Sequence, residues 1–295
     1  MPQVIATNTL SQMTQNNLDK SQKAQGQAIE RLSSGQRINS AKDDAAGLAI
    51  SDRMNSQVKG LEQANRNAND GMSMAQTAES ALGSVTDNLQ RVRELTVQAA
   101  NGTYTDDDRK SINNEINSRL EEIDRVGKDT TFNGKQLLGT SDDGSFTGGT
   151  FDEAAGSKVD LQVGAYDKQK ISLEMTDARG IAKGLKGSDA NSSGNSLINA
   201  DGKLQDGALA KVDAQIKSVD DTRSKLGAQQ NRLQSTVESN ASAATNLSSA
   251  KSQIADADFA KEASNMTSSQ IMQQAGQSVL AQANQVPQGA LSLLK

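Results

Sequence analysis

The C-terminal third of the chain carries a row of mostly apolar residues spaced by seven positions, which limits the folds open to it. The row consists of Val212, Val219, Leu226, Leu233, Asn240, Leu247 and Ile254. Four residues after members of this row lie Ile216, Val237 and Ala244. A seven-residue repeat of this length is typical of a coiled-coil helix. The pattern predicts one long helix over 207–255, with Asn240 fixing the register of the seam.

The N-terminal half carries apolar rows that could pack against this helix. One row holds Leu61, Ala68, Ala75, Leu82 and Leu89, and a second holds Val85, Val92 and Ala99. A later row of Ile112, Ile116, Leu120 and Ile123 predicts another helix. Thr105 and Asp108 have the spacing of a capping box at its start. Gly102 is expected in the left-handed conformation where the preceding helix ends.

These rows together predict a mainly α fold, an elongated coiled-coil-like helical bundle in the form of a rod. A small β-hairpin is expected between its halves, because Val159, Leu161 and Val163 alternate with polar residues. The alternation resumes at Ile171, Leu173 and Met175 after a turn at 164–168. Residues 184–203 are rich in Gly, Ser and Asn and are expected to form a surface loop.

We therefore expect three regions. Residues 1–44 and 256–295 form a terminal helical domain, and residues 45–140 and 205–255 form the helical rod. Residues 141–204 form a short, variable, surface-facing hairpin and loop region.

The two ends of the chain carry apolar stripes with no obvious core to cover them. The first stripe holds Val4, Ile5, Leu10, Met13, Leu18, Ile29 and Leu32. The second holds Met272, Ala275, Val279, Ala283, Val286, Ala290 and Leu293. Because an isolated helix is marginal without tertiary packing, we expect both ends to be mobile in the free chain. They would become ordered when subunits pack together.

Composition argues against most kinds of chemistry. The 295 residues include no Cys, His or Trp, which removes cysteine nucleophiles and zinc–thiolate sites. The side chain whose pKa lies nearest neutrality is also missing. The net charge of −5 argues against a general nucleic-acid binder. The paired acids Asp43 and Asp44 diverge on a helix and lack further ligands. We expect no enzyme activity, no metal and no cofactor.

The first residues have neither the basic region nor the apolar run of a secretory signal peptide. No stretch approaches the roughly 20 apolar residues that span a bilayer. If the protein leaves the cell, its export route is expected not to read a cleavable signal, and no membrane insertion is expected.

Several longer strings resemble the bacterial flagellin family. They run over 29–35 (IERLSSG), 37–47 (RINSAKDDAAG), 66–71 (RNANDG), 89–95 (LQRVREL), 270–276 (QIMQQAG) and 291–294 (LSLL). The resemblance covers nearly all of 1–138 and 205–295. It implies an extracellular subunit that self-assembles through its terminal helices into the flagellar filament used for motility. In that filament the terminal helices pair in an inner tube and the rod lies outside it.

The resemblance also implies partners. These are further copies of the chain, the flagellar export apparatus, a flagellin chaperone, the filament cap and hook-associated proteins. Two alternatives remain, a hook–filament junction protein and a secreted coiled-coil adaptor. A junction protein would stop at a short ring, and an adaptor would form a stable small oligomer.

Two groups of residues are candidates for contacts. The assembly candidates are Arg31, Leu32, Asp43, Asp44, Met272, Val279, Val286 and Leu293. The first four lie near the helix break at 33–35, where a solvated charged turn is the simpler interpretation. The resemblance favours a hinge and a contact between subunits. It also implies that Arg91, Leu95 and Glu115 form a patch bound by the host Toll-like receptor for flagellin.

Overall fold

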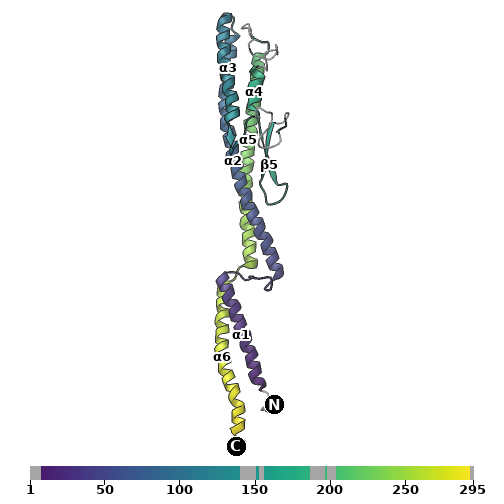
Figure 1. Ribbon diagram of the computed structural model, residues 1–295, viewed down its shortest axis with the longest axis vertical. Helices are drawn as coiled ribbons and strands as arrows, with labels where there is room; N and C mark the ends of the chain where they lie inside the picture. Colours follow the sequence, from purple (N-terminus) through teal and green to yellow (C-terminus); the bar gives the residue numbers. More distant parts are fainter. Residues whose placement is uncertain (1–7, 140–150, 153–155, 187–196, 198–203, 293–295) are drawn as a thin grey trace. The chain divides into compact units, whose positions relative to one another are not determined.

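The computed structural model describes residues 8–139, 151–152, 156–186, 197 and 204–292 (Figure 1). Its helices are α1 (Thr9–Ser34), α2 (Ala45–Ala99), α3 (Asp106–Asp129), α4 (Ala178–Lys186), α5 (Ala208–Ala255) and α6 (Phe259–Ser292). The strands are β1 (Thr131–Phe132), β2 (Lys135–Gln136), β3 (Phe151–Asp152), β4 (Gly156–Gln162) and β5 (Lys170–Met175). The predicted mainly α fold with a small β region is confirmed.

The chain divides into two compact units. Unit 1 comprises residues 1–58 and 245–295, and unit 2 comprises residues 59–244. Both long helices, α2 and α5, contribute to both units. Within the described residues, no helix combines the length and the apolar character that a membrane span requires.

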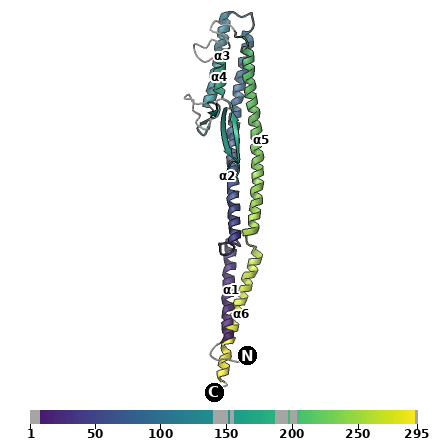
Figure 2. The ribbon, with the colours of Figure 1, turned by 90° about the vertical axis from the view of Figure 1, so that its right-hand side faces the viewer.

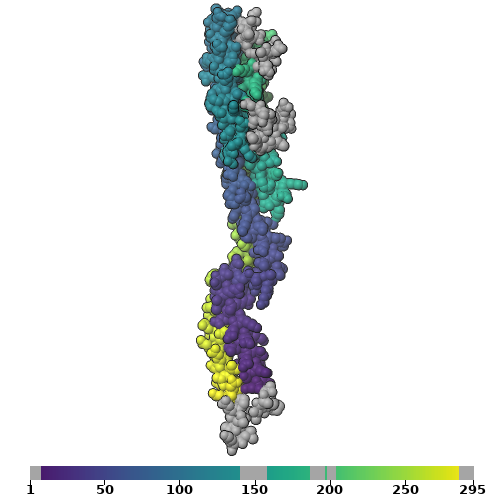
Figure 3. Space-filling view, viewed as in Figure 1, coloured from purple at the N-terminus to yellow at the C-terminus, as the bar shows by residue number. Residues whose placement is uncertain are grey.

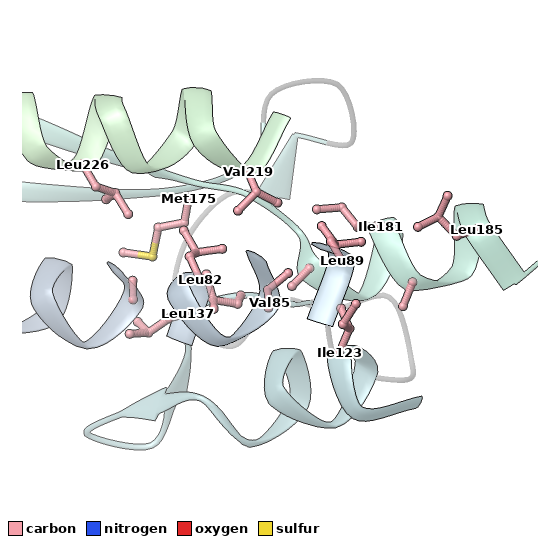
Figure 4. Packing of buried hydrophobic residues seen from close by; sticks show 14 of the residues in the cluster. Leu82, Val85, Leu89, Ile123, Leu137, Met175, Ile181, Leu185, Val219 and Leu226 are labelled. Atoms are coloured by element: carbon pink, nitrogen blue, oxygen red, sulfur yellow. The ribbon is translucent and has the colours of Figure 1, made fainter. Parts of the chain in front are cut away.

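The core of unit 2 is built from the rows that the sequence predicts. Four members of the predicted seven-residue row on α2 are fully buried: Ala68, Ala75, Leu82 and Leu89. Four members of the predicted row on α5 are fully buried as well: Val212, Val219, Leu226 and Leu233. Figure 4 shows Leu82, Val85 and Leu89 pointing toward side chains of α3, α4 and α5. Further along α5, Asn240 is half-buried and donates a hydrogen bond from Nδ2 to the carbonyl oxygen of Val163 at 2.8 Å. It therefore ties α5 to the hairpin region.

The predicted capping box at the start of α3 is confirmed. The backbone N–H of Asp108 donates to Thr105 Oγ1 at 3.3 Å, and the N–H of Thr105 donates to Asp108 Oδ2 at 3.0 Å. The expectation for Gly102 is wrong, because the glycines with positive φ among the described residues are Gly35, Gly134 and Gly207. The chain leaves α2 through a turn in which Asn101 Oδ1 accepts the N–H of Thr103 at 3.3 Å, so no left-handed residue is needed.

The predicted hairpin is formed by β4 and β5. Val159 pairs with Leu173 and Leu161 with Ile171, and β3 adds a third antiparallel strand beside β4. On the β5 edge, Gln229 of α5 donates from Nε2 to the carbonyl oxygen of Ser172 at 3.1 Å. Because this bond satisfies an edge carbonyl, it fastens the small sheet to the helical bundle.

Two elements of unit 2 lie outside the sequence predictions. The short β1–β2 hairpin turns at Asn133 and Gly134, with φ of 49° and 76°, the signs that a type I′ turn requires. Helix α4 packs on α3, where Arg179 Nε lies 3.0 Å from Asp124 Oδ1. The loop predicted for 184–203 begins inside α4, where Leu185 is buried, so the prediction is wrong there. Most of the remaining loop lies outside the described residues.

In unit 1, α1 and α6 run side by side and antiparallel (Figures 1 and 2). Asn8, at the start of α1, donates from Nδ2 to the carbonyl oxygen of Ala283 at 2.8 Å. Arg31, near the end of α1, pairs with Glu262, near the start of α6. Figure 3 shows the purple atoms of α1 against the yellow atoms of α6.

Candidate functional site

The seam between α1 and α6 is made mostly of small residues, with Glu262 as the exception. On α1 it includes Thr14, Ser21 and Ala28, and on α6 it includes Glu262, Ser269, Gly276 and Ala283. Both rows have the seven-residue spacing of a coiled coil. All but the half-buried Gly276 are buried, and a Cβ at that glycine would lie 3.5 Å from Leu18 Cδ1. Small side chains therefore let the two helices approach closely.

Several large apolar side chains of the same helices are exposed. They are Leu10, Met13 and Ile29 on α1, and Phe259, Ile271, Met272 and Val279 on α6. Met13 is 65% exposed and Ile271 is 61% exposed. A self-sufficient helix pair would bury its largest apolar residues between its members. This pair instead leaves several of them in water, as a surface that contacts another molecule would.

Met272 and Val279, two of the predicted assembly residues, lie beside Leu18 in an open groove between α1 and α6. The groove has a volume of about 550 Å³. Its other lining residues are Thr14, Asn17, Lys20, Ser21, Ala24, Ala275 and Gly276. Val286 lies further along α6, and Leu293 lies outside the described residues. We group the apolar groove with these exposed side chains as a candidate binding surface, which we call the terminal-helix face.

Arg31 and Leu32 lie at the end of the helix pair. Arg31 Nη1 is 3.2 Å from Glu262 Oε1, and Asn265 donates from Nδ2 to Glu262 Oε2 at 3.2 Å. The Glu262 side chain is only 8% exposed, so its charge requires these partners. Leu32 is half-buried. Arg31 thus pairs within the chain with a buried acid on the facing helix.

Asp43 and Asp44 shape the loop between α1 and α2. Asp43 Oδ2 accepts the hydroxyl and the backbone N–H of Ser40, both at 3.0 Å. The Ser40 hydroxyl is the main cause that holds the pKa of Asp43 below its ordinary value. Asp44 Oδ1 accepts the N–H of Gly47 at 2.8 Å, which caps the first turn of α2. Both acids therefore have a local structural role within one chain.

The predicted receptor patch is brought together only in part. Arg91 of α2 pairs with Glu115 of α3 and with Glu94, each at 3.0 Å. The hydrogen bonds from Glu94 and then Glu115 raise the pKa of Arg91 above its ordinary value. Leu95 is 2% exposed and packs in the core of unit 2. The exposed part of the patch is therefore charged, with Leu95 in the core below it.

Sequence reasoning missed two contacts near these sites. Arg93 Nε lies 2.6 Å from Asp213 Oδ1 and joins α2 to α5. The loop after α1 also forms a bridge with the turn before α6, pairing Gln36 with Asp256. Neither contact has a sequence signature, because the partners lie more than one hundred positions apart. Among the described residues, no three acidic side chains are arranged to hold a metal ion.

Comparison with known families gives matches at both ends of the chain. The model of the bacterial flagellin N-terminal helical region matches residues 5–143. The model of the bacterial flagellin C-terminal helical region matches residues 209–294. The two matched regions contain all of α1, α2, α3 and α6, and all of α5 except its first residue.

Individual flagellins match over the whole chain. A flagellin of Serratia marcescens is 44% identical and one of Xenorhabdus nematophila is 46% identical, each with complete coverage of both chains. A flagellin of Bacillus subtilis is 42% identical over 99% of this chain and 98% of its own. Among solved structures, a putative flagellar hook-associated protein from Vibrio parahaemolyticus shares the fold. Its TM-score is 0.50 at 19% identity, over 72% of this chain and all of that one.

Flagellins are structural proteins and not enzymes, and they are components of the extracellular flagellar filament. The flagellins named above are more than 40% identical to this chain along all or nearly all of its length. Its helices, apart from α4 and the first residue of α5, lie in the regions that the flagellin helical models match. The terminal-helix face thus belongs to a protein whose relatives are filament subunits. The chain is a member of the bacterial flagellin family.

Proposed function

We propose that this chain polymerises through its terminal-helix face, where other copies bury the side chains that α1 and α6 leave exposed. The observation that carries the proposal is the inverted arrangement of unit 1. Mostly small residues fill the seam within the chain, and several large apolar residues remain exposed. Membership of the bacterial flagellin family favours further copies of the chain as the occupant.

The free energy gained by burying the exposed apolar side chains is large enough to drive association between copies of the chain. Full burial of one Leu, Ile, Met or Phe side chain contributes about 1.5–3 kcal/mol. Several such side chains are exposed on α1 and α6. A few of them buried together can offset the roughly 4–15 kcal/mol that association costs in lost freedom of motion. A polymer repeats this contact at every subunit.

The assembly candidates take different roles in this proposal. Met272 and Val279 make apolar contacts with a neighbouring copy, and Val286 and Leu293 continue their row at a spacing of seven. Arg31 and Leu32 hold the end of the helix pair in place. Asp43 and Asp44 fix the course of the loop that leads into α2.

The test replaces one exposed apolar residue on α6 and compares it with a polar neighbour. Ile271→Glu removes an apolar side chain and adds a charge, whereas Gln274→Glu adds the same charge at another exposed position. The critical concentration for polymerisation, measured by sedimentation, should rise on the order of tenfold or more for Ile271→Glu. It should change much less for Gln274→Glu. Equal effects of the two substitutions would refute an apolar contact at Ile271.

The same face is a candidate for contacts before assembly. A flagellin chaperone would cover the exposed residues of α6 during export, and the cap and hook-associated proteins would meet the ends of the polymer. Ile271→Glu should then weaken binding to the purified chaperone, measured by calorimetry, more than Gln274→Glu does.

Export without a cleavable signal would leave the N-terminal segment intact in secreted protein, which mass spectrometry can establish.

A second function rests on the pairing of Arg91 with Glu115 across α2 and α3. We propose that this exposed pair is part of a patch bound by the host Toll-like receptor. Arg91→Ala should lower the affinity for the receptor ectodomain about tenfold, as loss of an interface arginine can. Arg125→Ala is a matched control, because Arg125 is also exposed and also pairs with two acids, Glu122 and Asp129. Equal affinities of the two variants would argue against the patch.

A further inference from the structure

The loop after α1 and the turn before α6 are bound to each other by a short antiparallel bridge. The N–H of Arg37 donates to the carbonyl oxygen of Ala255 at 2.7 Å, and the N–H of Ala257 donates to that of Gly35 at 2.9 Å. Gln36 and Asp256 lie opposite each other between these two bonds. We call residues 35–37 and 254–257 the clasp.

Arg37 also caps the carboxyl end of α5. The last carbonyl groups of a helix have no partner within it and carry a partial negative charge. The guanidinium of Arg37 donates to the carbonyl oxygen of Ile254, in the last turn of α5, from 217 positions away. Its backbone N–H satisfies the next carbonyl, that of Ala255. One residue therefore closes this helix end with both its backbone and its side chain.

The remaining parts of the clasp set where α1 ends and α6 begins. Gly35 has φ of 70° and donates its N–H to the carbonyl oxygen of Arg31, which ends α1. Asp258 Oδ1 accepts the N–H groups of Ala260 and Lys261 at 2.9 and 3.2 Å, which starts α6. Each terminal helix is thus joined to a fixed end of the same bridge.

We propose that Arg37 is a positioning residue for assembly. By closing the clasp it holds the adjoining ends of α1 and α6 side by side, so that both helices enter the polymer as one pair from the same chain. The proposal rests on the proposed function, in which the terminal-helix face makes the contacts between copies. It adds that Arg37 maintains the pairing of the two helices that the single chain shows.

A disulfide across the clasp tests the pairing directly. The chain has no Cys, so a disulfide can form only at introduced residues. The two flanking hydrogen bonds make Gln36 and Asp256 a non-hydrogen-bonded antiparallel pair. The Cα atoms of such a pair lie about 4.5 Å apart, within the range of a disulfide.

The experiment uses the full chain with Gln36→Cys and Asp256→Cys, assembled into filaments and then mildly oxidised. Non-reducing electrophoresis should show monomers of altered mobility that return to normal on reduction, and the filaments should persist. Gln36→Cys alone should show no such shift. Disulfide-linked dimers, or no disulfide in the filaments, would overturn the intramolecular clasp.

Arg37→Ala and Arg37→Lys test the role of the side chain. Arg37→Ala should raise the critical concentration about fivefold, the size expected for loss of a cation at a helix carboxyl end. Arg37→Lys should bring the critical concentration most of the way back to the wild-type value, because an ammonium group can also donate to the Ile254 carbonyl. The melting temperature of unit 2 should stay unchanged, which separates positioning from general stability.

The outcomes separate this inference from the function on which it rests. If the wild-type chain polymerises and Arg37→Ala polymerises equally well, the positioning role fails and the proposed function stands. If the wild-type chain itself does not polymerise, the proposed function fails first. An effect of Arg37→Ala that Arg37→Lys does not reduce would also contradict a role for the positive charge.

Discussion

At the scale of single residues, glycines in unit 2 show where packing leaves room and where it does not. A Cβ at Gly83, inside α2, would have no heavy atom within 4 Å apart from its chain neighbours and the nearby backbone of its own helix. A Cβ at Gly127, inside α3, would lie 2.9 Å from Arg179 Cγ and 3.2 Å from the carbonyl oxygen of Leu138. The backbone atom cannot yield as a flexible side chain can.

We predict opposite effects for the two alanine substitutions. Gly83→Ala should stabilise the chain by about 0.5–1 kcal/mol, because alanine loses less entropy in a helix. Gly127→Ala should destabilise it by about 1–3 kcal/mol, the usual effect of overpacking. Denaturant unfolding of the full chain measures both. A stabilising Gly127→Ala would show that α4 can move away from α3 at little cost.

Asp108 gives a prediction about pH. Its hydrogen bonds with the hydroxyl and then the backbone of Thr105 hold its pKa below the ordinary value. A carboxyl group with a lowered folded-state pKa stabilises the fold above its unfolded pKa, and the effect is lost as the pH falls through the folded value. Asp108→Asn should therefore lower the melting temperature at pH 7. The difference from wild type should narrow below about pH 4, and a constant difference would contradict the role of the charge.

At the scale of elements, the pairing of α4 with α3 depends on Arg179. Its side chain is 7% exposed, whereas its partner Asp124 is 40% exposed. Removal of the arginine would leave a cavity, but water could still reach the unpaired acid. Arg179→Ala should therefore destabilise unit 2 by about 2–4 kcal/mol. Arg179→Met retains most of the side-chain volume and should therefore lower the stability of unit 2 clearly less. Equal losses of stability in the two variants would show that the charge alone accounts for the effect.

Whether an element could be predicted from the sequence depends on how long a repeating apolar pattern it contains. Helices α2, α3 and α5 of unit 2 follow from apolar rows, and the β4–β5 hairpin follows from strict alternation. Helix α4 was missed because its apolar residues Ile181 and Leu185 give only two turns of pattern. Strands β1 and β2 have two residues each, too few for a period.

The seam of α1 and α6 could not be predicted for a different reason. Sequence patterns identify a buried face by its large apolar residues, but several of those on α1 and α6 are exposed. The facing rows of Thr14, Ser21, Ser269 and Gly276 resemble a solvated surface in the sequence. The apolar stripes predicted at the two ends are only partly covered within the chain, because Met13 and Met272 are exposed and Leu18 is half-buried. Contacts such as Arg31 with Glu262 depend on this pairing and have no local signature.

At the scale of the whole molecule, the two units differ in how far they bury their apolar residues. Unit 2 buries its apolar rows from α2, α3 and α5 in one core. Unit 1 leaves residues such as Met13, Ile271 and Met272 exposed in the single chain. Unit 2 should therefore fold without partners, whereas unit 1 needs other copies to bury its apolar surface.

The most direct test is electron microscopy of the purified full-length chain beside a version lacking residues 1–40 and 259–295. All of the terminal-helix face is removed in the shortened chain, but the core of unit 2 is intact. The full-length chain should form long filaments, and the shortened chain should stay monomeric with a cooperative unfolding transition. Filaments from both chains, or the same small oligomer from both, would contradict assembly through the terminal helices.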